Sequence, residues 1–381
     1  MRVIIVGGGI GGITAALACE RKGIAVDVYE RAPKLTEVGA GVSLWPNALK
    51  ALHQLGMRTV LDAMSFAIQD GAVRRADGVF LSRTSAQEFV RRFGLPTTVF
   101  HRAELMDALV QAARNIPIHL GHECRHIEQN GDIVTVHFTN GTRATCHVLV
   151  GADGLRSVVR DRLGLPGRIR YAGYTAGRGI TAFDTRGLIG GETLGCGRRF
   201  GVVPISRNRV YWYATDNTPE GERELPEASK ARLRRMFGTW HDPIPAILET
   251  ADAAAILRND IYDRDPLDRW GSGRITLLGD AAHPMTPNLG QGACQAIEDA
   301  LVLARCLAGG SDAGASLRRY ESDRVSRTAS IVNASRRVGR IGQVESPIIC
   351  RLRDGLLRLA PRSLTYRNLA PVVGYEGHLD H

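Results

Sequence analysis

The sequence predicts an α/β fold with an inserted β-sheet and C-terminal helices. Three observations predict its α/β core: an N-terminal apolar strand that breaks into a glycine-rich turn, and two later apolar strands that each end in an acidic residue, Asp153 and Asp280. At about 150 residues per domain, the 381 residues correspond to two or three domains with a substantial core.

The composition is that of a globular chain, with 44% hydrophobic and 23% charged residues. No apolar run reaches the roughly 18 residues of a membrane-spanning helix, so disordered and integral membrane proteins are excluded. Residues 1–6 are too short an apolar run for a signal peptide, and we expect a cytoplasmic protein. Seven scattered cysteines without a Cys-x-x-Cys pair predict reduced, mostly buried thiols rather than disulfides or a metal site.

Lysine and arginine outnumber aspartate and glutamate by 49 to 39, which gives a net charge of +10. The basic residues are spread along the chain and are not interleaved with aromatic residues as in a base-stacking surface, so no nucleic-acid partner is expected. The positive field instead favours anionic partners such as phosphorylated cofactors and carboxylate substrates.

The first thirty residues carry a dinucleotide-binding pattern. A strand over residues 2–6 leads into Gly-x-Gly-x-x-Gly, a helix over 13–22 follows, and a strand over 25–29 ends in an acid. The first glycine permits the turn, the second lets the backbone approach a pyrophosphate, the third allows close helix packing, and the acid binds ribose hydroxyls. This pattern alone does not distinguish FAD from NAD. The binding residues it predicts are Gly7, Gly9, Ile10, Gly11, Gly12 and Glu30.

Two later segments place an acid after a buried strand. Residues 148–152 form an apolar strand followed by Asp153 and a helix. Residues 274–279 form another, followed by Asp280, a loop and a helix over residues 293–307. Either acid alone would be interpreted as a helix N-cap or a turn residue.

In this order the three motifs resemble those of the FAD-dependent single-component (group A) aromatic monooxygenases, which are related to salicylate and para-hydroxybenzoate hydroxylases. The resemblance extends from residue 1 to about residue 310 and includes residues 41–49 and 101–105. Residues 45–47, 171–174 and 287–292 are similar to the branch that contains urate hydroxylase and zeaxanthin epoxidase.

The resemblance implies a Rossmann-like FAD-binding domain assembled from three segments, with an inserted β-sheet substrate domain and a C-terminal helical tail. The implied boundaries are 1–72, 99–168 and 266–345 for the FAD-binding domain, 73–98 and 169–265 for the substrate domain, and 346–381 for the tail.

The resemblance also assigns cofactor contacts. Asp280 would bind a ribityl hydroxyl, Arg102 and Asp153 the pyrophosphate region, and Glu30 the adenosine ribose. N–H groups at a loop and helix start would stabilise negative charge on the reduced flavin. The remaining implied residues are Arg31 and Ser43 along the cofactor, the backbone of Cys124 at the adenine, and Gly290, Gln291, Gly292 and Ala293 at the flavin.

The activity implied is hydroxylation of an aromatic or heteroaromatic small molecule with NAD(P)H and O2, through a flavin C4a-hydroperoxide. No second Gly-x-Gly-x-x-Gly unit exists, so NAD(P)H is expected to bind transiently. Three alternatives stay open: epoxidation of an isoprenoid or other alkene by the same chemistry, a flavoprotein oxidase that inserts no oxygen, and a plain NAD-binding dehydrogenase.

The substrate wall is expected between residues 169 and 265. Residues 198–204 and 209–214, separated by Ser206-Arg207-Asn208, predict a hairpin with Tyr211 and Tyr213 on one face. Similarity to urate hydroxylase places Arg199 and Tyr211 at the substrate.

The loop before the glycines departs from the urate enzyme. Asn288 stands where that enzyme has an acid, so this chain lacks a carboxylate base there and urate is not expected as substrate. The Pro287 carbonyl would orient a substrate hydroxyl or cap the loop. His283 is assigned to the scaffold rather than to acid–base chemistry.

Beyond residue 310 the sequence predicts helices. Residues 317–342 form a charged helix, and after it Ile348, Ile349, Leu352, Leu356 and Leu359 form an apolar stripe opposite several arginines. Such a stripe can lie on anionic lipid, but it more often docks on its own domain, and we expect docking. The chain is expected to be a monomer or a homodimer.

Overall fold

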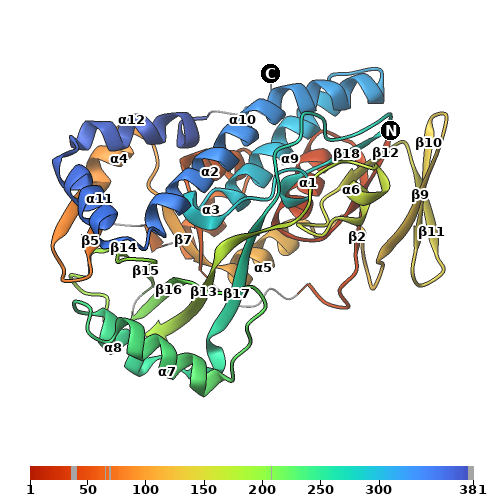
Figure 1. Cartoon of the computed structure of the whole chain (residues 1–381). Coiled ribbons are helices and arrows are strands. Elements are labelled where there is room, and N and C mark those ends of the chain that lie inside the picture. Colours follow the sequence, from red (N-terminus) through yellow and green to blue (C-terminus); the bar gives the residue numbers. More distant parts are fainter. Residues whose placement is uncertain (36–40, 65, 68–69, 207, 376–381) are drawn as a thin grey trace.

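The computed structural model describes residues 1–35, 41–64, 66–67, 70–206 and 208–375. Figure 1 shows a sheet near the N-terminus covered by helices, and a second, larger sheet whose outer side is covered by two helices at the lower left. All seven cysteines are unpaired and six of them are buried, as the sequence predicts.

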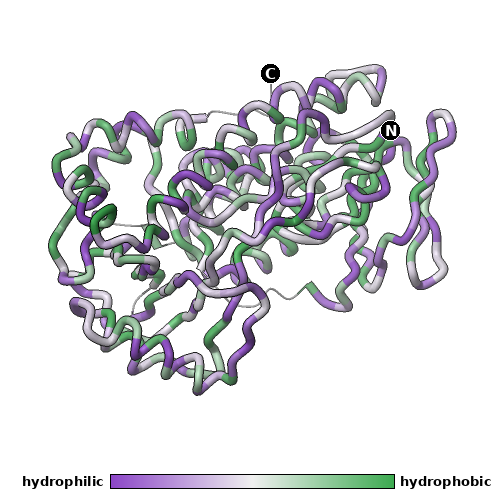
Figure 2. The backbone as a smooth tube through the Cα atoms, viewed as in Figure 1, coloured by the Kyte–Doolittle hydropathy of each residue, from purple (hydrophilic) through white to green (hydrophobic). Residues whose placement is uncertain are grey.

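The first sheet is parallel, with the strand order β18-β12-β1-β2-β8. Residues 3–5 of its central strand are fully inaccessible to solvent, because they lie in the apolar core that this sheet forms with the surrounding helices and with a small second sheet over residues 124–146. Figure 2 shows the apolar residues concentrated in this layer. The carboxyl ends of β1, β12 and β18 lie at one edge, which brings the three sequence motifs together and confirms the predicted α/β fold. The strands are β1 (Arg2–Val6), β2 (Ala25–Glu30), β8 (Ile118–Leu120), β12 (Val148–Gly151) and β18 (Ile275–Leu277).

Helices pack on this sheet in the predicted order. Helix α1 (Ile10–Arg21), which follows the glycine-rich turn, packs against α9 (Gly292–Ala308), which follows Asp280, and the long α10 (Ala313–Gly342) packs on α9. These helices are α1 (Ile10–Arg21), α2 (Pro46–Gln54), α3 (Arg58–Met64), α5 (Arg102–Ala112), α6 (Val158–Arg162), α9 (Gly292–Ala308) and α10 (Ala313–Gly342).

Two small sheets flank the parallel sheet, with the orders β11-β10-β9 and β3-β7-β4. Their strands are β3 (Gly41–Leu44), β4 (Phe66–Ala67), β7 (Thr98–His101), β9 (Cys124–Asn130), β10 (Ile133–Phe138) and β11 (Arg143–Cys146). Short 3-10 turns lie at η1 (Ala253–Ala255), η2 (Gly279–Ala281) and η3 (Pro287–Leu289).

The larger sheet has seven strands in the order β17-β13-β16-β15-β14-β5-β6. Its outer face packs on α7 (Pro226–Phe237) and α8 (Ile244–Thr250) around Phe200 and Trp212. These segments fall mostly within the predicted substrate domain, although the domain boundaries stay a prediction. The strands are β5 (Gly71–Arg75), β6 (Phe80–Thr84), β13 (Arg170–Ala182), β14 (Gly190–Leu194), β15 (Arg198–Ser206), β16 (Arg209–Asn217) and β17 (Leu257–Asp263).

The predicted hairpin is confirmed as β15 and β16, which pair antiparallel. Asn208 adopts a φ of 62° at the turn, while Arg207 lies outside the described residues. The predicted alternation is also confirmed: Trp212 and its neighbours on that face enter the apolar core, while Tyr211 and Tyr213 face the opposite side.

Two helices follow α10, namely α11 (Pro347–Leu359) and α12 (Arg362–Val373). α12 packs on α4 (Ala86–Phe93), where Tyr366, Val372 and Val373 join a small apolar cluster. The expectation that the apolar stripe of α11 docks on its own domain is wrong, since all five of its side chains are exposed. The helix instead attaches to the protein through its polar side. No helix among the described ranges is long and apolar enough to cross a bilayer.

Candidate active site

A cavity of about 610 Å³ lies between the edge of the parallel sheet and the inner face of the larger sheet. The glycine-rich turn, β3 and the loop after β18 form one side, and the hairpin β15–β16 forms the other. The cavity contains most of the residues that the sequence predicts for the site. They are Gly9, Ile10, Gly11, Ser43, Arg102, Arg199, Tyr211, Asp280, Pro287, Asn288, Gly290, Gly292 and Ala293.

The three motif glycines differ in what surrounds them. A Cβ on Gly7, whose φ is +115°, would lie 2.2 Å from the carbonyl oxygen of Ala152, and one on Gly12 would lie 1.9 Å from that of Gly7. A Cβ on Gly9 would meet nothing within 4 Å. Gly7 and Gly12 therefore allow close packing, whereas Gly9 leaves room for a ligand at the start of α1, where no side chain caps the helix.

The acids that follow β2 and β12 bind backbone N–H groups. Glu30 accepts hydrogen bonds from the N–H groups of Gly8 (2.7 Å) and Ala32 (2.9 Å) and so braces the glycine-rich turn. Asp153 accepts from the Val158 N–H (2.7 Å) and the Ser157 hydroxyl at the start of α6. Neither side chain lines the cavity, so their predicted cofactor contacts stay predictions, as do those of Arg31 and Cys124.

Asp280 differs from these two acids because its carboxylate faces the cavity. Within the described residues it accepts no hydrogen bond, yet protein surrounds it closely enough that burial raises its pKa, against the opposing effect of His283 and Arg102. A carboxylate placed in this way can accept hydrogen bonds from ligand hydroxyls.

The loop between β18 and α9 forms the floor of the cavity. Pro287 starts η3, Gly290 adopts a left-handed φ of 60°, and α9 begins at Gly292 without a side-chain cap or an acid in its first turn. Its first N–H groups are therefore available to a negatively charged ligand group. Gln291 is the exception in this loop, since its side chain is buried away from the cavity.

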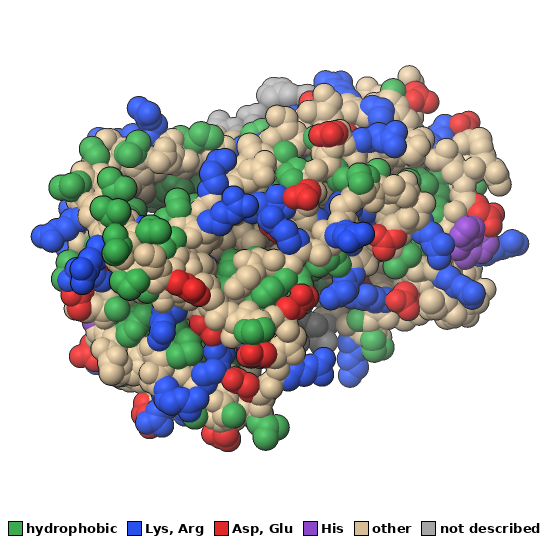
Figure 3. All heavy atoms as spheres, viewed as in Figure 1, with side chains coloured by type: hydrophobic (Ala, Val, Ile, Leu, Met, Phe, Trp, Pro, Cys, Tyr) green, Lys and Arg blue, Asp and Glu red, His purple; other side chains and the backbone are tan. Residues whose placement is uncertain are grey.

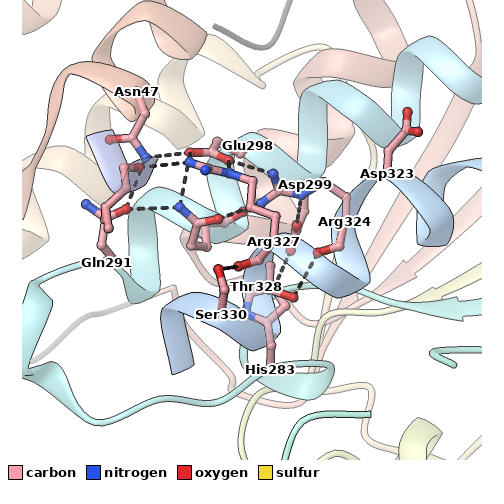
Figure 4. Close-up of polar contacts among 12 residues, drawn as sticks. Asn47, His283, Gln291, Glu298, Asp299, Asp323, Arg324, Arg327, Thr328 and Ser330 are labelled. Atoms are coloured by element: carbon pink, nitrogen blue, oxygen red, sulfur yellow. Dashed lines mark hydrogen bonds and ion pairs between the residues drawn. The ribbon is translucent and has the colours of Figure 1, made fainter. Parts of the chain in front are cut away.

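A buried polar cluster supports this loop from behind (Figure 4). Arg324 donates to Glu298 (2.6 Å) and Asp299 (2.7 Å), and Arg327 donates to both oxygens of Glu298. Asn47 links Glu298 to the Gln291 side chain. Burial alone would raise the pKa of Asp299, but His283 and Arg324 outweigh it and lower the pKa to about 2. The cluster ties α2, α9 and α10 together beneath the loop.

His283 belongs to this cluster. Its Nε2 lies 2.6 Å from Asp299, and its ring packs near Trp270. The ring is buried and does not line the cavity, so the geometry supports the scaffold role assigned from the sequence.

The opposite side of the cavity carries a fixed cation. Arg199, 3% exposed, donates to Gln343 (2.8 Å), Glu192 (3.1 Å) and Asn288 (2.7 Å). Although burial works to lower its pKa, Glu192 and Tyr213 raise it above its usual value. Asn288 also accepts from the Tyr174 hydroxyl and donates to Thr286 and to the Ser335 carbonyl. Asn288 thus connects the cation to the loop at the cavity floor.

Glu192 and Tyr213 complete this wall, and the sequence analysis assigned a role to neither. The Tyr213 hydroxyl donates to Glu192 (3.0 Å) across Gly201, which pairs with both residues in the sheet. A Cβ on Gly201 would lie 2.0 Å from the Tyr213 ring, so only glycine leaves room for this contact. Burial, reinforced by Glu192, raises the pKa of Tyr213 well above its usual value, and its hydroxyl stays protonated.

Arg178, on β13, is a second cation at the cavity that the sequence analysis missed. No acceptor for its guanidinium is found among the described residues. It lies near Tyr211, whose pKa is raised by burial and lowered in part by Arg178 and Arg102. The Tyr211 ring in turn packs on Gly41 of β3.

The remaining wall is apolar. Trp45 and Met285 contribute from the side of the loop, and Leu369, Val372 and Val373 contribute from α12. Arg327 fixes the end of α12 by donating to the carbonyl oxygens of Pro371 (2.7 Å) and Val372 (2.8 Å). The C-terminal helix, which the sequence analysis left without a role, therefore helps to enclose the cavity.

The residues present fit a flavin dinucleotide. The open Gly9, the uncapped starts of α1 and α9 and the unpartnered Asp280 carboxylate offer sites for a pyrophosphate, a charged ring edge and a hydroxyl along one side of the cavity. The opposite wall carries Arg178, Glu192, Arg199 and Tyr213, which are groups that can bind a small polar molecule. Fold and site together define a flavoprotein that acts on a small molecule.

Comparison with known proteins identifies the family. A family model described as the FAD binding domain matches residues 1–335, and the chain belongs to this family. Among its relatives is the aurachin C monooxygenase/isomerase of Stigmatella aurantiaca, 43% identical over 94% of both chains. Another is the 3-amino-4-hydroxybenzoate 2-monooxygenase of Streptomyces cremeus, 36% identical over 94% of this chain and 92% of the relative.

A solved structure with the same fold is Klebsiella pneumoniae HpxO complexed with FAD and uric acid. It superimposes with a TM-score of 0.92 and 31% identity, covering 98% of this chain and 96% of HpxO. The chain is therefore an FAD-dependent monooxygenase that uses NAD(P)H, and the resemblance noted in the sequence is confirmed.

Proposed function

We propose that this enzyme hydroxylates an aromatic or heteroaromatic small molecule that carries a carbonyl or an ionisable hydroxyl group. One observation carries the proposal: a single cavity combines the flavin-side features with a wall of two arginines, Glu192 and Tyr213. Bound FAD supplies the hydride acceptor for NAD(P)H and the centre that activates oxygen. The chain's own residues bind and orient the substrate and exclude water.

Each wall residue has a proposed task. Arg199 and Arg178 attract the electron-rich oxygen of the substrate and favour its ionised form. Glu192 holds Arg199 and the protonated Tyr213 in place, while Tyr211 packs against the ring. The apolar side chains of α12 cover the remainder of the substrate, so that oxygen transfer takes place away from water.

Urate does not fit this wall as a substrate. Asn288 is an amide and cannot accept a proton as a carboxylate does. Both its oxygen and its nitrogen already bind protein groups, with the oxygen accepting from Arg199 and Tyr174. We assign Asn288 to positioning Arg199 rather than to proton transfer.

The test is anaerobic reduction of the purified holoenzyme by NADH or NADPH, with and without hydroxybenzoates, quinolones and purines. We expect one compound class to accelerate the anaerobic flavin reduction and, in separate aerobic turnovers under ¹⁸O₂, to gain one oxygen atom. If every compound leaves the anaerobic reduction rate unchanged, and hydrogen peroxide equals the NAD(P)H consumed in the aerobic turnovers, the proposed hydroxylation fails.

The cofactor side has its own test with a matched pair of variants. Asp280→Asn removes the carboxylate that faces the cavity, whereas Asp268→Asn changes an exposed acid that does not line the cavity. We expect the first variant to bind FAD about tenfold more weakly and the second to bind it normally. Equal FAD affinities in a fluorescence titration would remove Asp280 from the binding site.

A further inference from the structure

Helix α11 presents its apolar side to solvent and its polar side to the protein. Five large side chains spaced along one face are all more than half exposed: Ile348 (71%), Ile349 (51%), Leu352 (63%), Leu356 (71%) and Leu359 (83%). We call these five residues the apolar stripe of α11. Their intervals of one, three, four and three residues keep them on one side of the helix.

The opposite side of α11 fixes its orientation. Arg353 is buried, binds Asp354 (2.9 Å) and donates to the carbonyl oxygen of Gly195 (3.2 Å). Cys350 on the same side packs against the carbonyl oxygen of Val344. These contacts keep the apolar stripe turned towards solvent. Rotating the helix to bury the stripe would break the hydrogen bonds of Arg353 and Cys350.

A stripe of this size requires a partner. Single exposed apolar residues are ordinary, but a contiguous patch on a helix marks a surface for a protein or a membrane. Figure 3 shows apolar side chains gathered at the left end of the molecule, over the region of α11 and α12, with lysine and arginine side chains among them.

The charges around the stripe are almost all positive. Residues 347–375 contain five arginines and one acid, Asp354, which is already paired. Arg351, Arg358, Arg362 and Arg367 are exposed and form no ion pair within the described part of the chain. The neighbouring strand β6 adds Arg83, stacked on Phe80.

We propose that the apolar stripe of α11 and these arginines bind the surface of a bilayer that contains anionic lipid. A helix with an apolar face flanked by arginines lies at the interface, its side chains entering the acyl region while the guanidinium groups meet lipid phosphates. A second copy of the chain fits less well, since a two-fold contact would oppose the unpaired arginines of both copies.

Docking has a consequence for the cavity. The next helix, α12, begins at Arg362 and contributes Leu369, Val372 and Val373 to the cavity wall. Because α12 follows α11 directly in the chain, binding through α11 places this wall on the helix next to the one that contacts the lipid. The inference does not rest on the proposed substrate, because vesicle binding is measured without turnover.

Vesicle sedimentation of the full-length holoenzyme tests the proposal. Vesicles of phosphatidylcholine with about one third phosphatidylglycerol should bind the protein, and pure phosphatidylcholine should bind it several-fold less. Leu352→Glu combined with Leu356→Glu should weaken binding more than about tenfold. The matched control is Leu225→Glu, since Leu225 is 78% exposed and lies outside α11; its binding should be unchanged.

A second variant tests the charges without touching the stripe. Arg351→Gln combined with Arg358→Gln should weaken binding several-fold and flatten its dependence on salt. Size-exclusion chromatography of the same proteins tests the alternative that the stripe binds a second copy of the chain. A holoenzyme that ignores anionic vesicles overturns the proposal, whether it stays monomeric or forms a dimer that the stripe variant abolishes.

Discussion

Two clusters of charged side chains flank the cavity, one behind the loop at its floor and one on the larger sheet. Behind the loop, Arg324 and Arg327 meet Glu298 and Asp299 in an ion-paired cluster in which only Arg327 is partly exposed. On the sheet, Arg199 is paired, but Arg178 faces the cavity without an acceptor among the described residues. Charged side chains that are fully paired with one another support the fold. A cation that faces a cavity without a partner is placed to bind a ligand.

The largest expected effect is on the cluster behind the loop. Arg324→Met leaves Glu298 and Asp299 without the counter-charge that they share, and we expect the free energy of unfolding to fall by about 3–5 kcal/mol. Denaturant unfolding of the holoenzyme measures it. The control Arg337→Met changes an exposed arginine of the same helix and should shift stability by less than about 0.5 kcal/mol. Equal stabilities for the two variants would mean that the ion pairs of Arg324 do not stabilise the fold.

The second prediction concerns the paired cation on the sheet. Arg199→Lys keeps the charge but cannot reach Gln343, Glu192 and Asn288 together, so we expect kcat/KM to fall by up to about 100-fold. Its loss of stability should be smaller than that of Arg324→Met. Steady-state kinetics with the compound that accelerates flavin reduction provides the number. A variant that loses stability but keeps its kcat/KM would move Arg199 from the binding wall to the scaffold.

The third prediction uses pH. The pKa of Asp299 is about 2 in the folded chain against an ordinary value of 3.8, so its ion pairs stabilise the fold fully above pH 4. As the pH falls from 4 towards 2, this stabilisation, about 2 kcal/mol, is lost. The melting temperature of the wild type should therefore fall faster than that of Asp299→Asn over this interval. Parallel curves for the two proteins would contradict the lowered pKa.

The sequence indicates which segments form the cofactor side of the site, but it leaves Glu192, Tyr213 and Arg178 of the opposite wall without a role, for a physical reason. The glycine-rich turn and the acids after β12 and β18 are local signals, and parallel strands necessarily bring them to one edge. Glu192 and Tyr213 meet only because β14, β15 and β16 pair in a register that places Gly201 between them. No spacing along the chain encodes that register.

The C-terminal helices illustrate the same limit. The spacing of the apolar stripe correctly indicates an amphipathic helix, but periodicity does not say which side faces the protein. The buried contacts of Arg353 decide it, and they depend on a backbone carbonyl 158 residues earlier in the chain. In the same way, only the folded chain shows that α12 reaches the cavity.

The affinity of the holoenzyme for its substrate, measured through the flavin absorbance change, tests the central claim most directly. Arg178→Gln removes a cation that faces the cavity, and Arg186→Gln removes an exposed arginine that follows the same strand, β13, and pairs with Asp184. We predict about tenfold weaker binding for the first variant and unchanged binding for the second, with both folded as stably as the wild type. Equal affinities for the two variants would contradict the claim that the open charge on the larger sheet binds the substrate.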